Sequence, residues 1–204
     1  MELYDTEEQQ VEAIKDWWKE NGKAVMFGAV IGLGGLFGWR YYQDTVVAAQ
    51  EAASHSYSQA VDALLAGGVA AEATLQTFID ANPKTEYAVL AAMQLAKVQV
   101  EAGHLDEALA QLEWAKGATQ DPALQPLLSL RVARVQAEQG QFDEALAQLS
   151  SIQQSAWAGR VAELRGDILL RKGDSTGAYA AYTEAQQATD ASQTLQMKLD
   201  DLAK

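Results

Sequence analysis

The chain has 204 residues, which allow one ordinary domain and an additional segment. It carries 28 acidic and 15 basic residues for a net charge of −13, and this acidity argues against nucleic-acid binding, which needs clustered Lys and Arg. Because the chain contains no cysteine, the sequence excludes disulfides and thiol catalysis.

Residues 1–22 are predicted to form an amphipathic N-terminal segment. The pattern Thr6–Gln9 has the residues of a capping box, so a helix should start there and run to about Glu20. One face of this helix is apolar, with Val11, Ile14 and Trp18. Asn21–Gly22 predicts a break after it. Such a helix usually lies in the membrane interface, although its acidic face leaves a contact with a cytoplasmic protein open.

Residues 23–42 are predicted to cross a membrane as a helix. Ala24–Trp39 contains no charged residue, and the flanking Lys23 and Arg40 can extend their charges to the lipid headgroups. A helix of about 20 residues is roughly 30 Å long, which matches the hydrocarbon core. Aromatic residues near both ends fit the membrane interfaces: Trp17, Trp18, Trp39, Tyr41 and Tyr42.

Two other interpretations exist for this apolar segment. A cleaved signal peptide fits poorly, because a long acidic stretch precedes the segment and bulky residues follow it, where a cleavage site would need small ones. A buried helix of a soluble domain stays open.

The distribution of Lys and Arg predicts the orientation of the span. Three lysines lie at or before its N-terminal end: Lys15, Lys19 and Lys23. At its C-terminal end Arg40 is the only basic residue before Lys84. Since positive residues favour the cytoplasmic side, we expect a single-pass protein of a bacterial inner membrane with a cytoplasmic N-terminus. The expected parts are a cytoplasmic segment (1–22), a transmembrane helix (23–42), a helical connector (43–53) and a periplasmic domain (54–204).

The span contains two GxxxG patterns. Gly28 and Gly32 form one, and Gly34 and Gly38 form the other. Small residues let two membrane helices approach closely, so these glycines are candidates for packing against another membrane helix. The other interpretation is that glycine is simply common in membrane spans.

Residues 54–204 contain an internal repeat. The segment GHLDEALAQL begins at Gly103 and recurs as GQFDEALAQL at Gly140, and weaker copies begin at Gly173 and Gly68. Each glycine is expected to end a helix, where a positive φ is easiest for glycine. Small residues that permit close helix packing follow at Ala108, Ala145 and Ala178. Larger residues that fill the space between helices come next on the same face: Leu112, Leu149 and Tyr182.

These units resemble tetratricopeptide repeats, which are helix–turn–helix units of about 34 residues that must stack to bury their apolar faces. In that register the repeats begin at Ser54, Val89, Pro126 and Gly159. Ser192–Ala203 reads as a helix that covers the last repeat. The resemblance implies an all-α fold, with a single N-terminal transmembrane helix followed by a tetratricopeptide-like α-solenoid of about four helix pairs and a C-terminal capping helix.

The same resemblance implies a groove lined by the first helix of each unit. Its ninth positions are Asp62, Lys97, Arg134 and Asp167. Nearby apolar positions are Leu90, Met93, Leu127 and Leu130. We hypothesise that this groove binds an extended or helical segment of a partner, with Lys97 and Arg134 pairing an acidic group. The other interpretation is that these charges are merely solvated.

The sequence offers no motif of catalysis. His55 and His104 are the only histidines and lack cysteine partners for a metal site, and no serine stands in a motif of nucleophilic catalysis. We therefore expect no enzyme, no metal and no cofactor.

The whole chain resembles the ancillary SecYEG translocon subunit family. The similarity covers YDTEEQQVEAIKDWWKENGKA, the glycine-rich span ending in GWRYY, LRVARVQ at 130–136 and the C-terminal LQMKLDDL. It implies an inner-membrane protein in contact with membrane lipid, with three kinds of protein partner. These are the SecYEG translocon, a membrane-anchored periplasmic prolyl-isomerase-like chaperone of the PpiD type, and exported client proteins.

The expected function is a non-enzymatic, membrane-anchored scaffold that associates with the SecYEG channel and links it to periplasmic chaperones. One alternative is an independent periplasmic holdase chaperone, for which isolated residues 44–204 should suppress aggregation of an unrelated client. Another is a regulator that acts through the cytoplasmic helix, for which deleting residues 1–20 should alter signalling and leave translocon association intact.

Overall fold

The computed structural model of the protein describes residues 7–202, apart from the side chains of residues 7–9 and 69. All regular structure in this range is helical, which confirms the all-α prediction. The helices are α1 (Glu7–Gly67), α2 (Glu72–Ala81), α3 (Glu86–Glu101), α4 (Leu105–Ala118), α5 (Leu124–Glu138), α6 (Phe142–Ser150), α7 (Ala158–Lys172), α8 (Ser175–Gln186) and α9 (Leu195–Leu202), with short 3-10 turns η1 (Gly68–Ala71) and η2 (Ser155–Trp157). The chain divides into two compact units, residues 1–52 and 53–204.

In the first unit, the predicted break at Asn21–Gly22 is wrong, because α1 continues through both residues. The Asn21 side-chain amide donates to the Trp17 carbonyl at 3.1 Å. The Trp18 indole covers Gly22, where an added Cβ would lie 3.2 Å from the ring. A glycine inside a helix costs only about 1 kcal/mol, which the continued hydrogen-bond ladder outweighs. Thr6 and the Gln9 side chain of the expected capping box lie outside the described residues.

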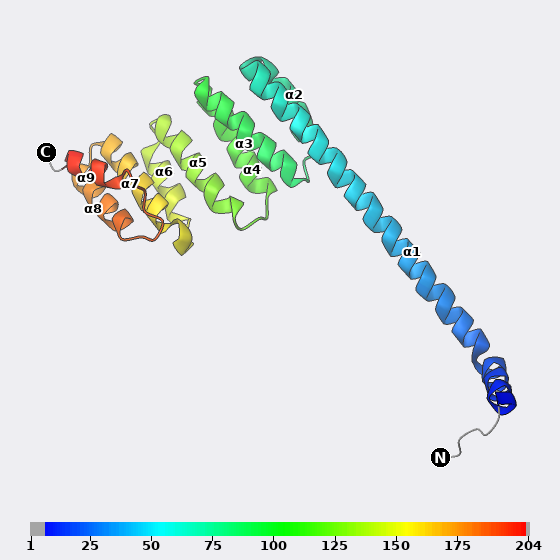
Figure 1. Ribbon diagram of the computed structural model, residues 1–204. Coiled ribbons are helices and arrows are strands. Elements are labelled where there is room, and N and C mark those ends of the chain that lie inside the picture. The colour runs from blue at the N-terminus through cyan, green and yellow to red at the C-terminus, as the bar shows by residue number, and fades with distance from the viewer. Residues whose placement is uncertain (1–6, 203–204) are drawn as a thin grey trace. The chain divides into compact units, whose positions relative to one another are not determined.

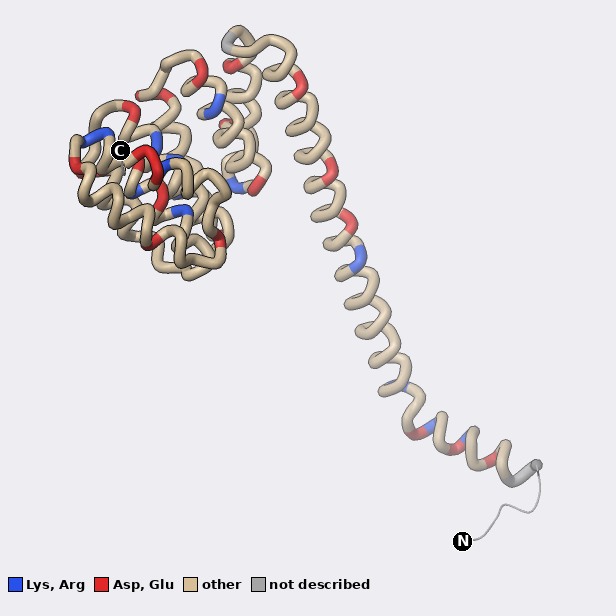
Figure 2. Tube along the Cα trace, turned by 60° about the vertical axis from the view of Figure 1, so that its left-hand side comes forward, with Lys and Arg blue, Asp and Glu red and all other residues tan. Residues whose placement is uncertain are grey.

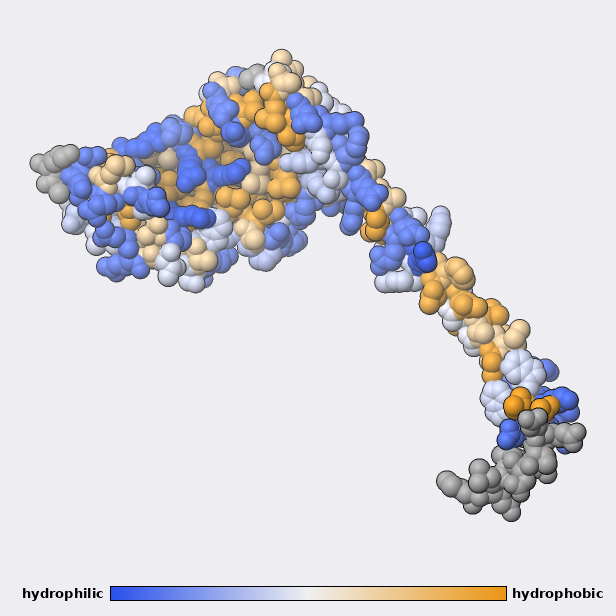
Figure 3. All heavy atoms as spheres, in the orientation of Figure 1, coloured by the Kyte–Doolittle hydropathy of each residue, from blue (hydrophilic) through white to orange (hydrophobic). Residues whose placement is uncertain are grey.

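The apolar stretch of α1 is exposed to its surroundings. Figure 2 shows a long run of this helix without a charged residue, and Figure 3 shows apolar side chains on its surface. Within the described residues, α1 is the one helix whose length and composition suffice to cross a membrane. Only 6% of its most apolar 18-residue stretch is buried, whereas the core helix of a soluble domain would be mostly buried.

The second unit stacks helices in consecutive antiparallel pairs (Figure 1). Residues 53–67 of α1 and the helix α2 come first and share a core cluster, with Leu64 of α1 and Leu75 and Phe78 of α2. The next pairs are α3–α4, α5–α6 and α7–α8. In the first pair, the Tyr57 ring lies 6.0 Å from the Phe78 ring and 5.6 Å from the Tyr87 ring. The tetratricopeptide-like solenoid expected from the sequence is confirmed.

The repeat glycines end the first helices as predicted. Gly68, Gly103, Gly140 and Gly173 all have positive φ, and no other described residue does. After α3, the His104 amide donates to the Gln99 carbonyl at 2.8 Å and the Gly103 amide donates to the Val100 carbonyl at 3.0 Å. This is the Schellman arrangement, and α5 and α7 end in the same way.

The predicted packing positions of the second helices are also confirmed. Ala108, Ala145 and Ala178 have no exposed surface. The larger residues of the same face, Leu112, Leu149 and Tyr182, are at most 2% exposed. These positions lie in the core clusters that join the first and second helices of each pair.

The helix α9 closes the stack, as expected. Its Leu195 and Leu199 are buried against the last pair. The loop before α9 is tied to the start of α7, because the Asp190 carboxylate accepts from the backbone amides of Gly159 at 2.7 Å and Arg160 at 3.2 Å. A carboxylate at a helix N-terminus satisfies amides that have no partner within the helix.

Candidate functional site

A groove follows the first helices of the second unit. One cavity of about 330 Å³ lies between α1 and α3, one of about 290 Å³ between α3 and α5, and one of about 280 Å³ between α5 and α7. The first two share Lys97 and Glu101, and the last two share Arg134, so the cavities adjoin. We call this surface the first-helix groove. The central cavity is lined by Met93, Ala96, Lys97, Val100, Glu101, Leu112, Arg131, Arg134 and Val135.

The structure brings some of the predicted groove residues together and separates others. Met93, Lys97, Arg134 and Asp167 line the groove. Asp62 is exposed on α1 but does not line these cavities. Leu90 and Leu127 are half-buried and pack against the core, and Leu130 is 2% exposed within the core. None of these three leucines lines the three cavities, and Leu130 is fully covered by its neighbours, whereas Leu90 and Leu127 keep part of their surface exposed.

The carboxylates that line the groove are all paired. Glu101 lies 3.7 Å from the Lys97 ammonium. Glu138 accepts two hydrogen bonds from the Arg171 guanidinium, at 2.6 and 3.1 Å. Such a two-point contact between a guanidinium and a carboxylate is geometrically specific.

Two arginines in the same groove remain without such a partner. Arg131 and Arg134 make no ion pair or side-chain hydrogen bond with any residue that the structure describes. Burial of the Arg131 guanidinium, and the charge of Arg134 beside it, lower the pKa of Arg131 from its ordinary value. The sequence interpretation missed Arg131, although its spacing of three residues from Arg134 places both on one helix face.

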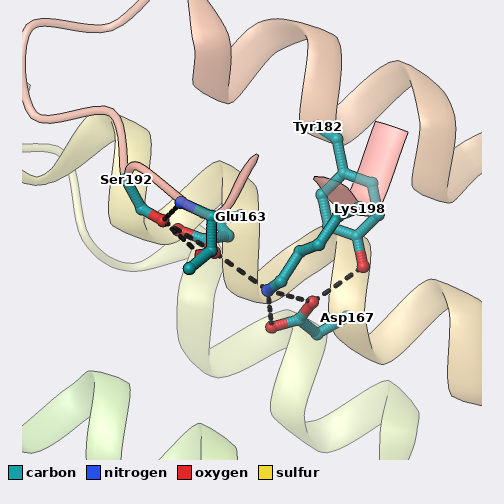
Figure 4. A network of polar contacts seen from close by, with 6 residues as sticks. Glu163, Asp167, Tyr182, Ser192 and Lys198 are labelled. Carbon is teal, nitrogen blue, oxygen red and sulfur yellow. Dashed lines mark hydrogen bonds and ion pairs between the residues drawn. The ribbon is translucent and has the colours of Figure 1, made fainter. Parts of the chain in front are cut away.

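Asp167 has a structural partner in the capping helix (Figure 4). The Lys198 ammonium on α9 donates to its two carboxylate oxygens at 2.6 and 2.9 Å. The Tyr182 hydroxyl donates to the same carboxylate at 2.7 Å, and Glu163 lies 2.9 Å from the Lys198 ammonium. The carboxylates of Asp167 and Glu163 are therefore paired with Lys198 of the same chain. The charges of the groove that have no partner among the described residues are those of Arg131 and Arg134, at its centre.

Within the described residues, no neighbouring side chain covers the glycines of the apolar helix. No side chain lies within 4 Å of an added Cβ at Gly28, Gly32, Gly34 or Gly38. At about 100° per residue, the pair Gly28 and Gly32 points roughly 120° away from the pair Gly34 and Gly38. One neighbouring helix could thus use either pair as its closest contact, but not both.

Metal chemistry has no visible basis in the part of the chain that is described. Residues 7–202 contain no group of three or more His, Asp or Glu side chains arranged to hold a metal ion. His55 and His104 are both exposed and lie in different helix pairs.

Comparison with known proteins finds similarity over nearly the whole chain. A family model described as a tetratricopeptide repeat-like domain matches residues 15–204. The ancillary SecYEG translocon subunit of Escherichia coli is 40% identical over 207 aligned residues, covering 100% of both chains. Those of Haemophilus influenzae and Aggregatibacter actinomycetemcomitans are 37% and 38% identical, covering 96% of this chain and 97% of each relative. A thermophilic TPR protein of Thermus thermophilus matches with a TM-score of 0.38 and 16% identity, over 74% of this chain and 98% of that chain.

The stacked helix pairs and their groove define a tetratricopeptide repeat-like protein, one whose first helix is long and apolar enough to span a membrane. Within that class, the identity over the full length is decisive. The chain belongs to the family of ancillary SecYEG translocon subunits.

Proposed function

We propose that this protein is a membrane-anchored adapter of the SecYEG protein-export channel, and that its repeat domain binds partners without catalysing a reaction. The observation that carries this proposal is the 40% identity, over all of both chains, to a protein named for its place in the translocon. The repeat-like fold adds support, because stacked helix pairs generally present extended surfaces for binding.

The anchor in this proposal is the apolar stretch of α1. Exposed aromatic side chains near both ends fit the two membrane interfaces: Trp17, Trp18, Trp39, Tyr41 and Tyr42. Three lysines on the N-terminal side favour a cytoplasmic N-terminus, and in this proposed orientation the second unit lies in the periplasm. Because the chain has no cysteine, single cysteines introduced at Glu12 and at Ala110 report the orientation. In intact spheroplasts, a membrane-impermeant maleimide should label only the position at Ala110.

The proposed task of the anchor is to keep the repeat domain beside the channel. Tethering raises the effective concentration of one binding module near another without any new contact. The first-helix groove then receives a segment of a membrane-anchored, prolyl-isomerase-like periplasmic chaperone or of an exported client. Its open cavities of about 280 to 330 Å³ and its mixture of apolar and charged side chains suit peptide recognition.

Purification from membranes tests this function. The full chain with a C-terminal tag is extracted in mild detergent, and the recovered proteins are identified by mass spectrometry. We expect the SecYEG channel together with a periplasmic chaperone. Recovery of the intact protein without the channel would contradict the proposal. Recovery of unfolded exported proteins alone would favour the holdase alternative.

A further inference from the structure

The centre of the first-helix groove combines a cationic pair with apolar walls. Arg131 and Arg134 lie one helical turn apart on α5 and both line the cavity of about 290 Å³. Facing side chains come from neighbouring helices, with Met93 and Val100 on α3 and Leu112 on α4. An occupant of this cavity would contact hydrocarbon and two guanidinium groups together.

The charge of this cavity is not balanced from within. Lys97 and Glu101, the other charged side chains of its lining, neutralise each other. Arg131 and Arg134 add two positive charges in a domain that is otherwise acidic, since residues 53–204 contain 11 Lys and Arg against 19 Asp and Glu. Two neighbouring like charges repel, and an anion placed between them relieves this repulsion.

We propose that Arg131 and Arg134 form a carboxylate-binding subsite, which takes an acidic residue of a partner segment whose neighbouring residues are apolar. Guanidinium groups bind carboxylates through paired hydrogen bonds, and the apolar wall then accepts the adjacent side chains. This inference rests on the proposed function, because it takes the groove to be the partner-binding surface.

A peptide fits these features better than a lipid headgroup. The subsite lies within the groove between α3 and α5, where the exposed Val100 beside the buried Met93 and Leu112 offers an apolar contact to a peptide side chain. The acidic remainder of the domain would repel an anionic membrane surface, whereas a single extended segment meets only the groove. Lipid binding is therefore an outcome that the test must distinguish.

Binding of synthetic peptides to the full chain tests the subsite. The protein is held in nanodiscs of phosphatidylcholine, and fluorescence anisotropy follows a peptide of alternating Leu and Glu. The same peptide with Gln in place of Glu removes the carboxylates, and acid and amide C-termini separate side-chain from terminal carboxylate binding. Vesicles containing phosphatidylglycerol, offered as competitors, report lipid binding.

The variants are Arg131→Gln and Arg134→Gln, and the matched control is Arg160→Gln. Arg160 is exposed, lies outside the groove and faces the Trp157 ring at 5.0 Å. Loss of a hydrogen bond between charged groups weakens binding by about 10-fold or more, so we expect that loss for each groove variant and none for the control. The double variant Arg131→Glu/Arg134→Glu should instead bind a peptide of alternating Leu and Lys.

Several results would overturn the subsite. One is that the acidic peptide does not bind to the wild-type protein. Another is that the groove variants and the control bind it equally well. A third is that phosphatidylglycerol vesicles displace the peptide while the Glu and Gln peptides bind with the same affinity, which would indicate a lipid site.

Channel recovery is measured separately, by purification of the same variants from native membranes. If the channel is recovered and the Arg131 and Arg134 variants bind the peptide as tightly as the wild-type protein, the subsite fails and the adapter function stands. If the arginines govern peptide binding but no channel is recovered, the adapter function fails and the subsite stands.

Discussion

Tyr182 packs against Gly166, and each residue has the size that the other requires. A Cβ added at Gly166 would lie 2.5 Å from Cδ1 of the Tyr182 ring, far inside van der Waals contact. The equivalent pairs of the two preceding units are Ala96 with Leu112 and Ala133 with Leu149. The last unit thus combines a larger side chain on its second helix with a smaller one on its first.

This relationship predicts non-additive effects on stability. Gly166→Ala should lower the free energy of unfolding by about 1–3 kcal/mol through overpacking, although alanine favours a helix by about 1 kcal/mol over glycine. Tyr182→Leu should cost a similar amount through the cavity and the lost hydrogen bond to Asp167. The double variant restores the pair of the other units and should be more stable than the sum of the single effects implies.

Urea unfolding followed by circular dichroism measures these three variants. The matched pair Ala133→Gly and Leu149→Tyr transfers the last unit's combination to the preceding one. In that unit, the double variant should again have a higher free energy of unfolding than the sum of the two single effects implies. Strictly additive free energies in both units would contradict the size relationship.

The Lys198 ammonium should hold the capping helix in place. It is 31% exposed as a side chain and contacts both Asp167 and Glu163, so Lys198→Gln removes the ion pair of two carboxylates, which keep only their hydrogen bonds from Tyr182 and Ser192. We expect a loss of about 1–2 kcal/mol in the free energy of unfolding, together with faster proteolysis of the C-terminal segment. The control is Lys172→Gln, whose partner Asp143 is 81% exposed and whose effect should stay below about 0.5 kcal/mol. Equal effects of the two variants would show that the α9 network adds nothing beyond a surface ion pair.

Stability should fall at alkaline pH in a way that depends on Tyr182. Burial, together with the hydrogen bond and charge of Asp167, raises the pKa of Tyr182 above its ordinary value of 10.0. The folded state therefore keeps this proton at pH values where the unfolded state loses it. The resulting stabilisation is complete below pH 10.0 and is lost as the pH rises from there toward the folded pKa.

Comparison with Tyr182→Phe isolates this contribution. Burial lowers the pKa of Lys198, but its hydrogen bonds to Asp167 and Glu163 raise it more, and this group is present in both proteins. The wild-type protein should be the more stable of the two near neutral pH, and its advantage should shrink once the pH exceeds 10.0. A constant difference across this range would contradict the raised pKa of Tyr182.

The two glycine pairs of the span should differ in their effect. Because they point to different sides of the helix, one neighbouring membrane helix can approach only one pair closely. Gly35 lies on the side of Gly28 and Gly32 and widens that small-residue face. We therefore expect Gly28→Leu/Gly32→Leu to reduce recovery of the channel from membranes, and Gly34→Leu/Gly38→Leu to leave it unchanged. The opposite order, or no effect of either, would reject this choice of face.

The repeat units were predictable because their signals are local. In each unit a glycine ends the first helix and an alanine follows five residues later. The backbone and packing requirements that these two residues meet can be recognised from the sequence of that unit alone. Gly103 and Ala108, for example, show the expected positive φ and complete burial. The helix α9 was predictable from another local signal, the i, i+4 and i+7 spacing of Leu195, Leu199 and Leu202.

The groove was less predictable, because it depends on contacts between distant segments. The engagement of Asp167 by Lys198 arises only when α9 folds back onto α7. Leu130 is buried because its side of α5 faces the next pair, which its position within one unit does not reveal. Arg131 was overlooked because the repeat register draws attention to the ninth position, where Arg134 stands.

Site-specific photocrosslinking in native membranes tests the central claim most directly. A photoreactive amino acid is placed at Lys97, where two cavities of the groove meet, and at exposed Ala110 on α4 as the control. The adapter account predicts crosslinks from the groove position to a subunit of the export channel, to a chaperone bound there or to an exported chain, and few from the control position. Crosslinks of equal strength from both positions, or to none of these proteins, would contradict it.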